Sequence, residues 1–196
     1  MIRAVLGVTF ALLLNQPADA QPRARAHARL AGLDGKPVGT ASFRAVNGGV
    51  LIELDLHGLS PGPHGMHLHT SGQCDAKSGF MKAGPILSLR PGRRHGYLAQ
   101  KGPLTGDLPN QVAHADGRLK ASMVTSAFTL GNGKRSIFDR DGVSLILKKR
   151  ADDYRTQPIG NSGDRIACGV VVRTQGPAPR PFFGKPAPKP AQNARP

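Results

Sequence analysis

The feature that most constrains the fold of this chain is a two-residue alternation of apolar and polar side chains, interrupted at short intervals by turn sequences. Successive side chains of an extended strand point to opposite faces, so this alternation is typical of strands with one buried face. Asp34-Gly35, Asn47-Gly48-Gly49 and Asp116-Gly117 are turn signals between such segments. The predicted strands are residues 25–30, 38–45, 50–56, 64–69, 111–115, 119–124, 143–147 and 166–172. Short strands at this spacing predict an all-β sandwich or barrel.

Two long segments, residues 70–108 and 148–164, lack this alternation. A structureless loop as long as the first usually carries function or is held down by another part of a compact domain. Cys74 lies near the start of this loop, and Cys168 lies in the last predicted strand. In an exported protein these two cysteines most simply form one disulfide, and the alternative is two free thiols.

The composition divides the chain into three parts. Residues 1–20 have the pattern of a secretory signal, with Arg3 as a positive start, an apolar run too short to span a bilayer, and Ala18-Asp19-Ala20 as a cleavage site. We therefore expect a periplasmic or secreted protein that begins at Gln21, without a transmembrane segment or lipid anchor. The domain is expected over residues 21–174. Residues 175–196 are predicted to be a disordered, Pro-rich basic tail.

The formal net charge of +15 bears on partners rather than on fold. The charge and the basic tail favour an anionic envelope surface as a partner, and the alternative is a solvated linker without a function of its own. The basic residues are not interleaved with aromatic ones, which argues against specific binding of single-stranded nucleic acid. The sequence contains neither a G-x-S-x-G nucleophile motif nor a phosphate-binding glycine loop. The oligomeric state is not predicted.

Three of the seven histidines, His64, His67 and His69, lie within six residues of one another. In a strand, His67 and His69 share one face, and Leu68 points to the other. Two imidazoles at this spacing can hold one metal ion, and imidazole suits copper or zinc. The alternative is that these histidines are satisfied by hydrogen bonds and serve only the structure.

Four motifs, taken in order, resemble those of the copper/zinc superoxide dismutases, especially the exported bacterial branch. The histidine strand resembles the family's HGFHxH strand, and residues 101–109 resemble its GHLGDLP segment with one residue inserted. Residues 151–154 resemble part of its charged loop, and residues 160–170 resemble its GNxGxRxACGV signature. The resemblance covers residues 26–172 and implies an eight-stranded Greek-key β-barrel or sandwich with two long loops.

The resemblance also implies roles for individual residues, each at a position that matches a family motif. They are copper binding for His67 and His69, zinc binding for His95 and Asp107, and a structural role for His64. Asp152 would link the two metal sites, Arg165 would guide superoxide to copper, and Cys74 and Cys168 would form the family disulfide.

Other positions depart from the family pattern. Ile86 stands where a histidine should bridge copper and zinc, and Lys148 stands where the last copper histidine is expected. A third zinc histidine is also missing, because Pro103 or Leu104 occupies its place. The resemblance therefore leaves copper with two of four histidines, and zinc with two ligands where structural zinc sites have four.

Three hypotheses follow for the function. The first is an active copper-dependent dismutase with a reduced ligand set. The second is a dismutase-like protein without normal activity that serves as a binding or structural module in the cell envelope, and the third is a non-catalytic copper-binding protein. Whatever copper site remains is expected at His67 and His69 and is expected to be weak, and a zinc site is doubtful. Metal content separates the second from the third, and a superoxide assay on copper-loaded protein isolates the first.

Overall fold

Eight strands build the part of the chain that the structure describes, as the alternation of side chains predicts. The computed structural model describes residues 24–138 and 141–174, so the predicted signal (1–20) and tail (175–196) lie outside the described residues. The strands are β1 (Arg25–Gly32), β2 (Pro37–Val46), β3 (Gly49–Leu56), β4 (Gly62–His69), β5 (Asp107–Ala113), β6 (Leu119–Thr125), β7 (Val143–Lys148) and β8 (Arg165–Arg173). Two short 3₁₀ helices, η1 (Ala76–Ser78) and η2 (Met81–Ala83), lie in the loop after β4. No helix in the described part of the chain has the length and apolar character needed to cross a membrane.

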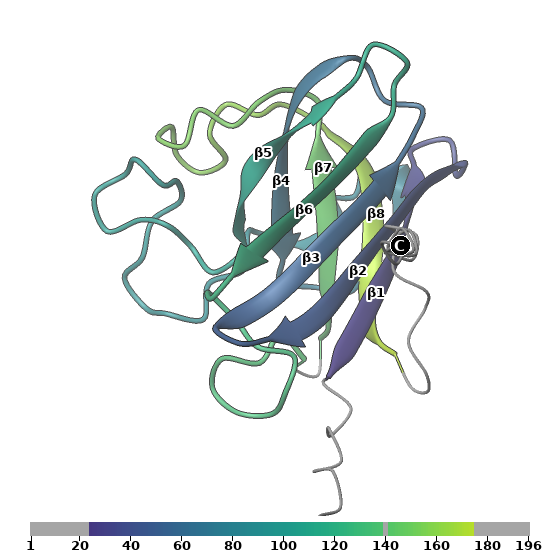
Figure 1. Cartoon of the computed structure of the whole chain (residues 1–196). Helices are drawn as coiled ribbons and strands as arrows, with labels where there is room; N and C mark the ends of the chain where they lie inside the picture. The colour runs from purple at the N-terminus through teal and green to yellow at the C-terminus, as the bar shows by residue number, and fades with distance from the viewer. Residues whose placement is uncertain (1–23, 139–140, 175–196) are drawn as a thin grey trace, which may run out of the picture.

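The strands form one antiparallel sheet that curls into a nearly closed barrel. Their order is β5-β4-β7-β8-β1-β2-β3-β6, so the connections from β3 to β4 and from β6 to β7 cross the barrel, as in a Greek key. Figure 1 shows β1, β2, β3 and β6 in one layer, with β5, β4, β7 and β8 behind them. The two end strands are joined by the turn at Gly117, where the backbone N–H of His114 donates to the carbonyl of Arg118. The predicted all-β Greek-key fold with two long loops is confirmed.

One strand, β5, departs from its predicted bounds further than the others. β5 begins at Asp107 and ends at Ala113, whereas the alternation predicts a strand over residues 111–115. Pro109 argues against a strand because it cannot donate a hydrogen bond to a neighbour, but β5 is an end strand of the sheet, and Pro109 is exposed there. The earlier start matters for the site, because it places Asp107 directly opposite His67 of β4.

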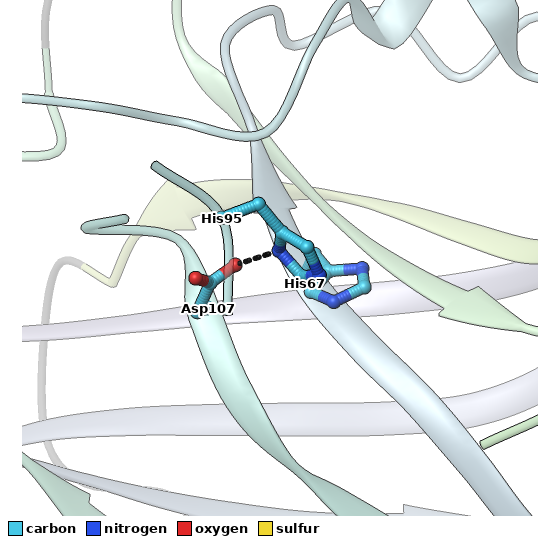
Figure 2. Close-up of side chains that lie close together, drawn as sticks. All are labelled: His67, His95 and Asp107. Carbon is cyan, nitrogen blue, oxygen red and sulfur yellow. Dashed lines mark hydrogen bonds and ion pairs between the residues drawn. The ribbon is translucent and has the colours of Figure 1, made fainter. Parts of the chain in front are cut away.

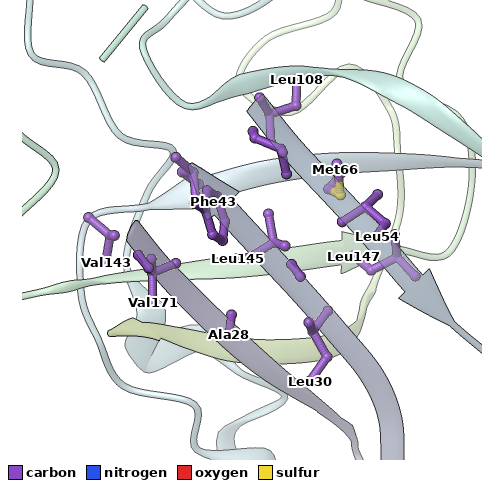
Figure 3. Packing of buried hydrophobic residues seen from close by; sticks show 14 of the residues in the cluster. Ala28, Leu30, Phe43, Leu54, Met66, Leu108, Val143, Leu145, Leu147 and Val171 are labelled. Carbon is purple, nitrogen blue, oxygen red and sulfur yellow. The ribbon is translucent and has the colours of Figure 1, made fainter. Parts of the chain in front are cut away.

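The hydrophobic core fills the inside of the barrel. Phe43, Met66, Leu68 and Leu145 are among its buried members, and Figure 3 shows side chains from several strands meeting there. Burying a side chain of this kind contributes on the order of 1.5–3 kcal/mol. Because Met66 and Leu68 point into the core, the alternating residues His67 and His69 of β4 point to the outside of the barrel, under the loops.

A second, smaller cluster packs the first loop onto the outside of the barrel. Phe80 and Ala83 of the loop pack against Ile146 of β7 and Cys168 of β8. A disulfide joins Cys168 to Cys74, with 5.5 Å between the Cα atoms, which is the pairing that the family resemblance implies. These contacts hold the backbone around Gly84 against the strand that carries the histidines.

Candidate metal centre

The outward-facing sides of β4, β7 and β8 carry most of the residues of the candidate site. In the register of these strands, His67 lies opposite Ile146, and His69 lies opposite Ser144. Two residues after Ile146, at the end of β7, Lys148 lies opposite Arg165 at the start of β8. The loops cover this face so well that His67, His69 and Lys148 are all buried.

His67 and His69 each have one ring nitrogen engaged and one without a partner. His67 Nε2 donates to Asp152 Oδ2 over 2.7 Å, and His69 Nδ1 donates to the carbonyl of Gly84 over 2.7 Å. These bonds fix the tautomers and leave lone pairs on His67 Nδ1 and His69 Nε2, which are buried and have no hydrogen-bond partner among the described residues. The two ring centroids are 6.3 Å apart.

An unpartnered buried nitrogen is costly, and two on neighbouring rings are unusual in a folded protein. Burial lowers the pKa of His69 to about 3, so its ring is neutral and its lone pair is available at physiological pH. A neutral imidazole whose other nitrogen is oriented by a carbonyl or carboxylate is the usual form of a metal-ligating histidine. The donor pair therefore fits a copper ion, for which imidazole is a suitable ligand.

His64 is engaged on both sides and is not available to a metal. Its Nδ1 lies 2.7 Å from the carbonyl oxygen of Lys148, and its Nε2 lies 2.8 Å from that of Ser60. The ring therefore ties the start of β4 to the end of β7. This geometry suits the structural role that the family resemblance implies.

A chain of hydrogen bonds connects His67 to the second loop and to β5. Asp152 accepts from His67 through one carboxylate oxygen and contacts His95 Nε2 through the other, at 3.2 Å. His95 Nδ1 lies 2.8 Å from Asp107 Oδ1. Although burial alone would raise it, hydrogen bonds from His67 and His95 hold the pKa of Asp152 well below its usual value.

The same chain makes His95 a cation in the metal-free protein. Burial alone would lower the pKa of His95, but hydrogen bonds to Asp107 and Asp152 outweigh it and raise that pKa to about 9. Asp107 is also well satisfied, because its second carboxylate oxygen accepts from the backbone N–H groups of Gly96 and Leu104. The positive ring thus lies between two buried negative groups.

His67, His95 and Asp107 form the tightest cluster of potential metal ligands in the described chain. One ligand atom from each lies within 4.8 Å of the others, and all three residues are buried. Figure 2 shows His95 above Asp107 with its ring next to that of His67. His67 belongs both to this cluster and to the pair that it forms with His69. The site therefore has two halves, one around His95 and one around His69, which meet at the ring of His67.

The second loop approaches this chain of hydrogen bonds very closely at Gly160. Its φ angle is +63°, and a Cβ atom there would lie 1.6 Å from Asp152 Oδ1 and 2.8 Å from His95 Nε2. Only glycine fits both the left-handed backbone and the available space. The glycine of this motif therefore closes the site over Asp152.

The half of the site around His69 opens into a pocket of about 950 Å³. Ile86, Lys148 and Arg165 line it together with His69, and apolar side chains of both loops complete its walls. Ile86 is 6% exposed and forms an isolated backbone bridge with His69, while Lys148 is only 2% exposed. Burial, followed by the nearby positive charge of Arg165, lowers the pKa of Lys148 to about 8.

Two groups of the site are not predicted from the sequence. The carbonyl of Gly84 accepts from both His69 and Arg165, and Arg165 also donates to the carbonyl of Phe80. Asn110 donates to the carbonyl of Asp152 and accepts from its backbone N–H. A sequence does not show which backbone carbonyls act as acceptors. Asn110 could have been noticed, because it is a polar residue in a strand and directly follows the motif of residues 101–109.

Comparison with known proteins agrees with the fold. Residues 38–171 match the family described as "Copper/zinc superoxide dismutase (SODC)". The chain is 34% identical over 172 residues to superoxide dismutase [Cu-Zn] 2 of Aquifex aeolicus, covering 87% of this chain and 99% of that one. It is 39% identical over 140 residues to the superoxide dismutase [Cu-Zn] of Caulobacter vibrioides, covering 70% of this chain and 80% of that one. The protein belongs to the copper/zinc superoxide dismutase family.

One similar solved structure is named as a superoxide dismutase-like protein rather than as a superoxide dismutase. The crystal structure of a superoxide dismutase-like protein from Bacillus subtilis aligns with a TM-score of 0.70 and 35% identity, covering 74% of this chain and 96% of that one. The Cu/Zn superoxide dismutase of Brucella abortus aligns with a TM-score of 0.59 and 29% identity, covering 74% of this chain and 98% of that one. The Bacillus subtilis protein has also been crystallised as a double mutant in which a tyrosine and a proline are replaced by histidine.

Proposed function

We propose that this protein is an exported superoxide dismutase-like protein that has lost several copper and zinc ligands. It lacks normal dismutase activity and binds copper weakly through His67 and His69. Family membership supports the copper chemistry, and the composition of the pocket next to His69 supports the loss of activity. Export rests on the signal pattern of residues 1–20.

One observation carries the proposal. Ile86 and Lys148, which stand where the family resemblance places two copper histidines, line the same pocket as His69. A hydrocarbon side chain donates no electron pair, so Ile86 leaves a ligand position of the copper site empty of any donor. The copper site therefore lacks donors at two positions where the family resemblance places histidine ligands.

Lys148 opposes copper more strongly than a neutral residue at the same position. An ammonium group repels Cu²⁺, and the pKa of about 8 keeps this amine mostly charged at neutral pH. Arg165 adds a second positive charge on the same side of the site. Copper held by two nitrogens beside two cations is expected to bind weakly.

Zinc is less well supported than copper. The remaining zinc candidates, His95 and Asp107, are bonded to each other, and both nitrogens of His95 face carboxylates. A zinc ion would have to displace the proton from a ring whose pKa is raised to about 9, and even with His67 it would gain three protein ligands, one fewer than a structural zinc site has. Protonated His95 supplies the positive charge that the two aspartates need without a metal.

Hydrogen bonds orient the two histidine rings of the site for copper. Copper bound there would supply one-electron redox chemistry. Asp152 holds the proton on His67 Nε2, and the carbonyl of Gly84 holds the proton on His69 Nδ1, so that the opposite nitrogens face a metal. Arg165 and Lys148 attract anions to the pocket.

Arg165 favours a second candidate function, an active dismutase with a reduced ligand set. Its guanidinium is held by the carbonyls of Phe80 and Gly84 beside the pocket, at the position from which the family resemblance implies guidance of superoxide. The third hypothesis, copper binding without catalysis, shares the copper site of the main proposal and differs only in its physiological role.

The test is copper binding by the purified full chain. After chelation and reloading, competition with a chromophoric copper chelator should show one weak site per chain. The double variant His67→Ala/His69→Ala should lose it. The matched control is His57→Ala/His114→Ala, which removes two exposed histidines and should leave binding unchanged. Retention of the site in the first variant would refute the assignment of these ligands.

A further inference from the structure

Lys148 and Arg165 form a pair of positive charges under the loops, and neither has an ion-pair partner among the described residues. They lie opposite each other across β7 and β8, an arrangement that is destabilising for like charges. Lys148 is 2% exposed, yet it takes part in none of the ion pairs of the described residues. A buried charge without a partner is expensive, so a missing counter-ion is the simplest explanation for its persistence.

The acids nearest to this pair do not neutralise it. Asp152 is committed to His67 and His95 through its two carboxylate oxygens. Asp164 is exposed and lies 3.9 Å from the amine of Lys149 instead. Asp164 lines the pocket, but no acid of the described residues forms an ion pair with Lys148 or Arg165.

The pocket has room and walls for an anion larger than superoxide. Its volume of about 950 Å³ is far greater than a diatomic ion fills, and it falls in the range of sites for small organic molecules. Beyond the two cations, His69 and the exposed Asp164, its lining is largely apolar, with Leu33, Pro85, Ile86, Leu104, Pro158 and Ile159. A ligand that matches both parts has an anionic head and an apolar body.

We propose that this pocket binds a small organic carboxylate. The carboxylate head lies between the amine of Lys148 and the guanidinium of Arg165, and the apolar body packs against Ile86 and Ile159. Two of the five N–H donors of Arg165 are used by loop carbonyls, so it retains donors for a carboxylate. The site requires no copper and is independent of the proposed function.

The test uses the full chain, freed of metal by chelation, in calorimetric titrations with hexanoate. Hexanoate should bind measurably, acetate more weakly because it lacks the apolar body, and hexylamine not at all because its head is positive. Lys148→Met should weaken hexanoate binding by about tenfold or more, as expected for loss of a charge-assisted hydrogen bond. Lys149→Met removes the same charge from the adjacent, exposed position and should leave binding within about twofold.

Two results would overturn the proposal. One is equal binding of hexanoate by wild type and Lys148→Met, and the other is equal binding of hexanoate and hexylamine by wild type. The second comparison needs no variant and so decides the matter even if Lys148→Met does not fold. Hexanoate is titrated into metal-free protein and copper into protein without hexanoate, so a failure of the copper site and a failure of the carboxylate site are told apart.

Discussion

The two halves of the candidate site meet at His67 and differ in how their buried charges are balanced. On the side of His95, two aspartates and a protonated imidazole neutralise one another in a closed chain of hydrogen bonds. On the side of His69, a lysine and an arginine lie together beside an unpartnered ring nitrogen. The charged groups of the first half are paired without a ligand. The second half contains two cations without an ion-pair partner and a ring nitrogen without a hydrogen-bond partner, which an anion and a metal could supply.

This difference indicates where stability and function reside. A closed polar network stabilises the loops that it connects, and removing one member leaves the others buried and unpaired. Uncompensated charges destabilise the fold and persist where a ligand neutralises them. We therefore expect substitutions in the first half to destabilise the protein, and a substitution at Lys148 to stabilise it.

The largest effect is expected from Asp152→Asn. The change leaves the imidazolium of His95 with one carboxylate instead of two and weakens the bond to His67. The free energy of unfolding of the metal-free protein should fall by about 3 kcal/mol or more in urea titrations. The control Asp164→Asn alters an exposed carboxylate and should change it by no more than about 0.5 kcal/mol. Equal effects of the two variants would contradict the closed network.

The destabilisation by Asp152→Asn should also depend on pH. The lowered pKa of Asp152 contributes stability above its ordinary value of 3.8, and this is lost as the pH falls below that value. The raised pKa of His95 contributes stability below 6.5, and this is lost as the pH rises through about 9. The difference between wild type and variant should therefore be greatest between pH 4 and pH 6.5. A difference that stays constant to pH 9 would argue against a protonated His95.

A smaller effect of opposite sign is expected from Lys148→Met. The variant removes a buried charge that faces Arg165 and replaces it with an apolar chain of similar length. The free energy of unfolding at pH 7 should rise by about 1–2 kcal/mol, as found when buried charges are replaced by apolar residues. Lys149→Met is the control, because its side chain is 62% exposed, and it should stay within about 0.5 kcal/mol of wild type. Destabilisation by Lys148→Met would show that the amine has a stabilising partner.

Copper affinity should respond to histidines introduced into the open half. The double variant Ile86→His/Lys148→His adds two imidazoles to the pocket of His69 and removes a cation, so its copper dissociation constant should fall by about tenfold or more, a gain of about 1.4 kcal/mol. Each single variant should gain less, because Ile86→His keeps the cation and Lys148→His leaves one ligand fewer. Unchanged affinity in the double variant would mean that these positions do not face the metal.

The smallest effect is expected from removing the tail. Residues 175–196 are rich in Pro and basic side chains and contain too few apolar residues to bury much surface. A chain that ends at Thr174 should keep its melting temperature, measured by circular dichroism, within about 1–2 °C, since a change of about 1 kcal/mol corresponds to roughly 2–4 °C at this size. A fall of many degrees would show that the tail packs against the barrel.

The strands of the barrel are predictable from the sequence because their pattern is local. Alternation and turn residues act over a few positions, and the eight predicted strands correspond to β1–β8. The start of β5 is missed because Pro109 interrupts the pattern, and its tolerance at an end strand depends on a sheet order that the pattern does not contain.

The site itself depends on contacts between distant segments. That His67 and His69 share a face follows from strand periodicity, but the pairing of Asp107 with His67 follows from the register of β4 and β5, 40 residues apart. The opposition of Lys148 and Arg165 likewise depends on a register shift at the end of β7. Family resemblance points to these residues individually, and only the folded chain shows which charges remain without a partner.

The central claim is that the open half of the site no longer supports rapid dismutation of superoxide. Superoxide dismutase is one of the enzymes known to work near the diffusional ceiling of about 10⁸–10⁹ M⁻¹s⁻¹, a benchmark that belongs to the family rather than to this chain. The direct measurement is the second-order rate constant of the purified, copper-loaded protein, determined by pulse radiolysis with the bound copper quantified. Our account predicts a rate constant orders of magnitude below that ceiling. A rate at the family's level would contradict it and would require a further ligand to complete the copper site.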